Sequence, residues 1–154
     1  MSPQSAVDAV AHAIQLSVAP VFLLSGIGAM MAVLANRLAR VVDRARVVEG
    51  KMPGAANERL KIRAELRALA VRAKIISWAI GLCTLTALLI SSVVAILFLG
   101  AFVQLNASLL VALLFVAGMT SFICALLLFL REVLIATANL RFGAHRHEAP
   151  DSPH

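Results

Sequence analysis

Residues 75–103 read IISWAIGLCTLTALLISSVVAILFLGAFV, and this stretch decides the fold. It contains no Asp, Glu, Lys, Arg or His, and it exceeds the roughly 20 residues that an α-helix needs to cross a hydrocarbon core about 30 Å thick. An unpaired backbone amide in lipid is costly, and only helices and closed barrels avoid that cost. Because polar and apolar residues do not alternate here as in a barrel strand, we predict a transmembrane helix.

Two more apolar runs, at residues 14–35 and 108–130, have the same character. Neither contains an ionisable side chain, and both are long enough for a span. Of the 154 residues, 61% are hydrophobic and only 14% are charged, which is below the share usual in soluble domains. The sequence therefore predicts an all-α membrane protein with three transmembrane helices.

The cations predict how these helices are oriented. Of the 14 Lys and Arg residues, 11 lie within residues 37–74 and the others follow the third span. Because cytoplasmic loops of membrane proteins are enriched in Lys and Arg, we expect both basic segments in the cytoplasm and the amino terminus outside. The first run has no positive segment before it, so we expect it to be retained rather than removed as a signal peptide.

The chain divides into consecutive segments on this basis. They are an extracytoplasmic amino-terminal segment (1–12), a first transmembrane helix (13–36), a basic cytoplasmic helical hairpin (37–74), a second transmembrane helix (75–103), an extracytoplasmic turn (104–107), a third transmembrane helix (108–130), a cytoplasmic helix extension (131–143) and a disordered tail (144–154).

The segment at 37–74 is predicted to be an antiparallel helical hairpin, because apolar residues recur with helical spacing on both sides of a break at Gly50, Pro53 and Gly54. The recurring residues are Leu38, Val41, Val42, Ala45 and Val48 in the first arm and Ile62, Leu66, Leu69, Ala70 and Ala73 in the second. We expect the two stripes to pack against each other. At about 1.5 Å per residue, the arms extend roughly 20 to 27 Å beyond the membrane.

Three stretches carry a resemblance to a known family: PVFLLSGIG at 20–28, NRLARVVDRAR at 36–46 and FLREVLIATANLR at 129–141. They resemble a family of small bacterial integral membrane proteins catalogued only as a domain of unknown function, over residues 14–142. The basic block at 36–46 is the most specific of the three. The resemblance implies a three-span bacterial protein of the cell inner (plasma) membrane, and it implies no activity.

The block after the first span holds the most informative charges. Its candidate residues are Asn36, Arg37, Arg40, Asp43, Arg44 and Arg46. Asp43 is three residues from both Arg40 and Arg46, so its carboxylate can be shared by two guanidinium groups. In one interpretation the arginines hold phosphate headgroups and fix the depth of the span. In another, copies of Arg37 and Arg40 ring an anion-selective vestibule, or Asp43 pairs across a subunit interface, with Asn36 capping, bridging helices or lining a pore.

The first span also contains residues suited to close helix packing. Pro20 leaves a carbonyl without its helical partner and favours a kink. The small residues that follow are Ser25, Gly26, Gly28, Ala29 and Ala32. Their spacing of four is typical of surfaces on which another transmembrane helix packs closely, and a gating hinge is the alternative.

Two further charged features lie in the basic segments. Arg59, Arg63 and Arg67 follow one another at steps of four, so they line one helix face and are candidates for binding anionic lipid or an acidic partner. Glu132, just after the third span, is expected to pair with a cation of the hairpin rather than to act as an acid or base.

The sequence has no catalytic triad, phosphate-binding glycine loop or zinc-binding spacing, and no ionisable group lies within a span. We therefore expect no enzyme activity, no metal, no cofactor and no nucleic-acid partner. The leading hypothesis is a homo-oligomeric membrane protein that forms an ion channel or pore. Its expected partners are membrane lipids, with anionic headgroups on the cytoplasmic side. The alternative is a membrane-anchored regulatory or scaffolding subunit whose basic hairpin binds an acidic cytoplasmic partner or anionic lipid.

Overall fold

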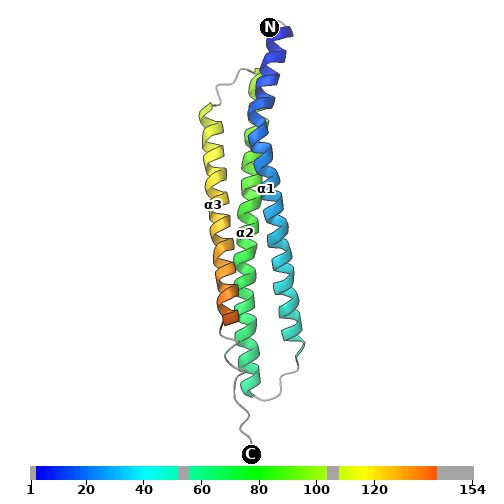
Figure 1. Ribbon diagram of the computed structural model, residues 1–154, viewed down its shortest axis with the longest axis vertical. Helices are drawn as coiled ribbons and strands as arrows, with labels where there is room; N and C mark the ends of the chain where they lie inside the picture. The colour runs from blue at the N-terminus through cyan, green and yellow to red at the C-terminus, as the bar shows by residue number, and fades with distance from the viewer. Residues whose placement is uncertain (1–2, 52–55, 104–107, 142–154) are drawn as a thin grey trace, which may run out of the picture.

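The fold consists of three long helices that lie side by side (Figure 1). The computed structural model describes residues 3–51, 56–103 and 108–141. The helices are α1 (Pro3–Glu49), α2 (Ala56–Val103) and α3 (Ser108–Arg141), and α2 lies between the other two. All three are long and apolar enough to cross a membrane, so the prediction of an all-α, three-span protein is confirmed at this level.

All three helices continue past the predicted spans. Helix α1 runs without interruption from the first span into the first arm, and the buried Pro20 does not end it. Helix α2 joins the second arm to the second span in the same way. Helix α3 continues beyond residue 130 to Arg141. The predicted turn at 104–107 and the predicted disordered tail at 144–154 lie outside the described residues.

The core is a seam with a seven-residue period. Its buried positions are Ile27, Leu34, Val41 and Val48 in α1, Leu69, Ile76, Cys83 and Ile90 in α2, and Gly118, Ala125 and Glu132 in α3. A repeat of seven keeps one face of a helix against its neighbour when the helices wrap with a left-handed twist. Because the seam passes from the spans into the arms, Val41, Val48 and Leu69 pack in the same cluster as the span residues. Most residues of the two apolar stripes of the hairpin pack in this cluster, as predicted, whereas Val42 and Ala70 are exposed.

Small residues of α3 allow it to pack closely against α2. A Cβ atom built on Gly118 would lie 3.2 Å from Ile90 Cδ1 and 3.5 Å from Leu89 Cβ. One turn further along, the buried Ser121 donates a hydrogen bond to the backbone carbonyl of Leu82 at 3.0 Å. The bond crosses between the helices, whereas Thr86 bonds back to its own helix. Helices α2 and α3 are therefore in close contact at the level of Gly118.

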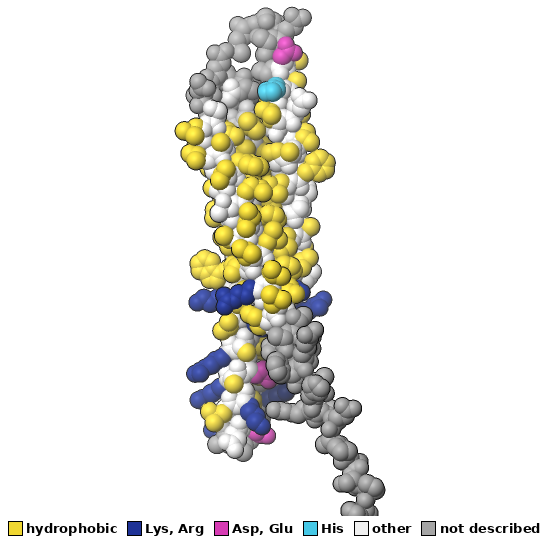
Figure 2. All heavy atoms as spheres, turned by 60° about the vertical axis from the view of Figure 1, so that its left-hand side comes forward, with side chains coloured by type: hydrophobic (Ala, Val, Ile, Leu, Met, Phe, Trp, Pro, Cys, Tyr) yellow, Lys and Arg dark blue, Asp and Glu magenta, His cyan; other side chains and the backbone are white. Residues whose placement is uncertain are grey.

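The outer surface divides into an apolar part and a basic part (Figure 2). Large hydrophobic side chains are exposed along all three spans, for example Phe22 at 74%, Leu88 at 62% and Leu109 at 72%. Lys and Arg side chains gather at the opposite end from the amino terminus and begin at a sharp boundary. We call this end, formed by residues 37–51, 56–74 and 131–141, the basic end. Its boundary with the apolar part is what a membrane surface would produce.

Candidate functional site

A buried ion cluster lies where the apolar runs of all three helices meet the basic end. Glu132 of α3 is only 1% exposed, and its two oxygens accept from different helices. Arg37 of α1 donates from Nη1 to Glu132 Oε2, and Arg72 of α2 donates from Nη2 to Oε1 at 2.8 Å. We call these three residues the Glu132 cluster. It links α1 directly to α3 and also holds α2 through Arg72.

The seam positions these side chains. Glu132 occupies a seam position, seven residues after Ala125, so it points between the helices. Arg37 and Arg72 each come three residues after a buried seam leucine, which places them on a face next to the seam. The guanidinium carbon of Arg37 also lies 5.1 Å from the centroid of the Phe129 ring, within the range of a cation–π interaction. Arg37 is therefore held by two residues of α3.

The electrostatics of the cluster favour a fixed geometry. A buried carboxylate is tolerated only when it is paired and hydrogen-bonded, and Glu132 has both partners. Bonds between guanidinium and carboxylate groups are charge-assisted and stronger than neutral ones. Two cations face one anion, so the cluster keeps a positive charge. It stabilises the junction of the helices and leaves the surface next to it electropositive.

A cavity of about 300 Å³ opens beside the cluster. Its lining residues are Arg37, Arg40, Val41, Arg44, Leu69, Arg72, Glu132 and Ala136, and we call it the arginine pocket. Arg44 reaches across to α2, where its Nε and Nη2 donate to Glu65 Oε1 at 3.1 and 2.8 Å. Arg40 is exposed and forms no ion pair within the described chain. Four arginines thus line a cavity whose lining contains one carboxylate.

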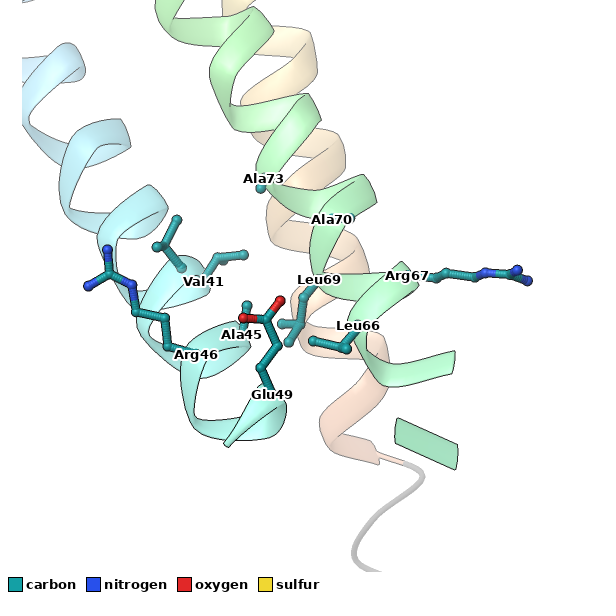
Figure 3. A pocket seen from close by; sticks show the side chains of 10 residues that line it. Val41, Ala45, Arg46, Glu49, Leu66, Arg67, Leu69, Ala70 and Ala73 are labelled. Carbon is teal, nitrogen blue, oxygen red and sulfur yellow. The ribbon is translucent and has the colours of Figure 1, made fainter. Parts of the chain in front are cut away.

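The two arms of the hairpin enclose a second, larger hollow of about 520 Å³, which we call the hairpin groove (Figure 3). Its walls are the alanine and aliphatic side chains of both stripes, among them Ala45, Leu66 and Ala70. Charged residues stand at its edges: the carboxylate of Glu49 turns toward the opposite arm, whereas Arg67 points away from the groove. An apolar hollow edged with charges is typical of a surface that accepts an amphipathic segment.

The small residues of the first span lie on the outside of α1. Ser25, Gly26, Gly28, Ala29 and Ala32 are all exposed. A Cβ atom on either Gly26 or Gly28 would meet nothing within 4 Å, so neither glycine serves packing inside the described chain. The hydroxyl of Ser25 bonds back to the carbonyl of Val21 at 3.4 Å. Only Pro20 of this set is buried.

The structure separates the residues predicted after the first span. Arg37 faces the protein interior and Arg44 the opposite arm, whereas Asn36, Arg40 and Arg46 are exposed. In the described residues Asp43 forms no ion pair, so the sharing of its carboxylate by Arg40 and Arg46 is not observed. The salt bridge to the second arm is formed by its neighbour Arg44 instead.

Arg59, Arg63 and Arg67 of the second arm are all exposed, and within the described part of the chain none of them is in a salt bridge. They remain candidates for contacts outside the protein. Among residues 3–51, 56–103 and 108–141 there is no group of three or more His, Cys, Asp or Glu side chains that could hold a metal ion.

The expected pairing of Glu132 with a cation of the hairpin is confirmed, but sequence reasoning missed Arg72 and the burial of the cluster. The sequence of α3 contains a pattern that predicts the burial of Glu132. The spacing of seven from Gly118 through Ala125 to Glu132 places the carboxylate on the small-residue face of α3, which is the face that packs.

The structure is that of a multi-pass helical membrane protein. It has three helices apolar enough to span a membrane, a basic hairpin between α1 and α2, and an ion cluster that links all three helices. The chain belongs to the family described as Protein of unknown function (DUF2721), whose family model matches residues 17–142. This match confirms the resemblance seen in the sequence. Comparisons with curated proteins and with solved structures found no match.

Proposed function

We propose that this protein is a membrane-anchored regulatory or scaffolding subunit whose hairpin binds an acidic cytoplasmic partner. The observation that carries the proposal is the hairpin groove, an apolar hollow of about 520 Å³ on arms whose outer faces display arginines that form no salt bridge among the described residues. An acidic amphipathic helix matches such a surface, because its apolar face would fill the groove while its carboxylates reach the arginines.

The concentration of cations at the basic end supports a cytoplasmic location for the hairpin and the carboxyl-terminal extension, with the amino terminus outside. For a bacterial protein of this kind the membrane is the inner one. In this orientation the groove and the arginine pocket are open to cytoplasmic molecules.

The distance of the outer arginines from the membrane favours a soluble partner over lipid. Along α2, Arg67 lies about 12 Å and Arg59 about 24 Å beyond Ile75, at about 1.5 Å per residue. The headgroup region adds only about 5 to 8 Å to the hydrocarbon core on each side. At physiological salt, charges more than about 8 Å apart are largely screened from each other in water. Arg59 and Arg63 are therefore better placed for a soluble partner than for headgroups.

Homo-oligomerisation is a second candidate, because the exposed small residues of α1 form a surface that the single chain leaves unused. Such surfaces let transmembrane helices approach closely, so a second copy is a suitable occupant. A pore built from several copies would extend this proposal. However, the hydroxyls of Ser25, Thr84 and Ser92 bond to carbonyls of their own helices, which gives no specific support for a polar pore lining.

Binding of an acidic amphipathic peptide to the full-length protein in nanodiscs tests the partner proposal. Reversing three charges with Arg59→Glu, Arg63→Glu and Arg67→Glu is expected to weaken binding by about tenfold, since three lost charge pairs of roughly 0.5 kcal/mol each at exposed sites add to about 1.5 kcal/mol. Filling the groove with Ala70→Trp is expected to weaken it as well. Fluorescence anisotropy of the labelled peptide gives the dissociation constants.

The matched control for the filled groove is Ala64→Trp, because Ala64 is exposed on the same arm but does not line the groove. This variant is expected to bind the peptide like the wild type. If the Ala70→Trp and charge-reversed proteins also bind with unchanged affinity, the hairpin groove is not a docking surface for acidic segments.

A further inference from the structure

We propose that the arginine pocket is a binding site for a phosphate group at the membrane surface. The pocket shares Val41 and Leu69 with the hairpin groove, but its charged residues Arg40, Arg44 and Arg72 do not line that groove, so the site goes beyond the proposed partner binding. Val41 and Leu69 add aliphatic side chains to its lining. All three helices contribute to its lining, so the site exists only in the folded protein.

The charge balance of the pocket calls for an anion. Both oxygens of Glu132 are already occupied by Arg37 and Arg72, so this carboxylate neutralises only part of their charge. Glu65 balances Arg44 from the rim, and Arg40 has no acidic partner in the described chain. The planar guanidinium group, with its fork of donors, is the side chain best suited to phosphate oxygens.

One unused hydrogen-bond donor supports the same conclusion. Arg72 Nε is buried and, among the described residues, has no acceptor. Buried polar atoms without a partner are rare in folded proteins, so each of them calls for an explanation. An oxyanion that entered beside Arg72, with a small shift of its guanidinium group, would supply the missing acceptor. Arg37 and Arg72 are already held in place by Glu132, so little side-chain freedom would be lost on binding.

The volume of the arginine pocket and its level relative to the membrane limit which ligands can bind. A cavity of about 300 Å³ is at the lower end of small-molecule sites, which fits one phosphate group with a short ester substituent rather than a long polyanion. The pocket begins directly beyond the apolar runs that end at residues 35 and 130. This is the level of lipid phosphates. The ligand is therefore either the headgroup of an anionic phospholipid or a soluble phosphate of similar size.

The experiment uses the full-length protein in two arms. In one arm, nanodiscs of phosphatidylcholine with a minor fraction of phosphatidylglycerol are dissolved, and native mass spectrometry counts retained phosphatidylglycerol. In the other, inorganic phosphate is titrated into phosphatidylcholine nanodiscs and binding is followed by calorimetry. Retention of phosphatidylglycerol identifies a lipid headgroup as the ligand, and saturable binding of inorganic phosphate identifies a soluble one.

The decisive variant is Arg40→Gln with Arg44→Gln, which leaves the Glu132 cluster intact. Its matched control is Arg59→Gln with Arg63→Gln, which removes the same charge from the same hairpin but outside the pocket. We expect the pocket variant to bind the probe about tenfold or more weakly and the control to bind it like the wild type. Equal losses in both variants would show nonspecific attraction to the basic end, and absence of binding in both arms would show that the pocket is not a phosphate site; either result overturns the proposal.

Discussion

Replacing Glu132 with glutamine is expected to lower the free energy of unfolding by about 3–5 kcal/mol, the range for breaking a buried ion pair from one side. The substitution keeps the shape of the side chain but leaves Arg37 and Arg72 facing each other without a carboxylate. Their repulsion and incomplete hydrogen bonding then oppose the packing of α3 on the other two helices. Denaturation by sodium dodecyl sulfate in mixed micelles, followed by circular dichroism, measures the loss.

The control is Glu65→Gln, which breaks the exposed pair with Arg44 and is expected to cost no more than about 1 kcal/mol. A triple replacement of Glu132, Arg37 and Arg72 by leucine is expected to recover much of the lost stability, because well-packed apolar residues often substitute for a buried ion cluster at no cost. If Glu132→Gln is no more destabilising than Glu65→Gln, the Glu132 cluster does not hold the helices together.

The second large effect is expected at Gly118. Of the described glycines, it is the one at which an added Cβ atom would come closest to a neighbouring atom. Gly118→Leu places a branched side chain against the fully buried Ile90, which lies 3.2 Å from the position of the new Cβ. Overpacking of this kind costs about 1–3 kcal/mol or more, because the neighbouring helix must move away. Displacement of α3 would also stretch the hydrogen bond from Ser121 to Leu82. The same denaturation assay measures this effect.

Gly81→Leu is the matched control, since a Cβ atom there would meet nothing within 4 Å. It is expected to leave stability unchanged or slightly raised, because leucine is a better helix former than glycine. Gly118→Ala should fall between the two, with a tight contact to the flexible end of Ile90 offset by the same gain in helix propensity. Equal stability of the Gly118→Leu and Gly81→Leu proteins would contradict the close approach of α3 to α2.

The spans and the hairpin could be predicted because both follow from local patterns. An uncharged run such as 75–103 has few structural options in lipid, and the apolar stripes around Val41 and Leu69 have helical spacing. The pairing of Glu132 was predictable for a similar reason. A single carboxylate beside a membrane boundary that is crowded with cations will pair with one of them.

Spacing within one helix did not identify the ion-pair partners, because these depend on how the helices are rotated and how far each slides along its neighbour. Spacing within α1 predicted that Asp43 pairs with Arg40 and Arg46, but Glu65 of α2 lies beside Arg44 and forms the bridge. Arg72 looked like one hairpin cation among many. Its role depends on the seam, which sets the height at which α2 meets α3. Recognising the period of seven across all three helices would have brought this prediction within reach.

Topology is the most direct test of the central claim that the Glu132 cluster, the arginine pocket and the hairpin groove all face the cytoplasm. Single cysteines are introduced by Asp8→Cys or Arg63→Cys after the native Cys83 and Cys124 have been replaced by alanine. Intact spheroplasts are then treated with a membrane-impermeant maleimide. We predict that the cysteine at position 8 reacts in intact spheroplasts and that the cysteine at position 63 reacts only after lysis. Labelling of position 63, but not position 8, before lysis would contradict the account.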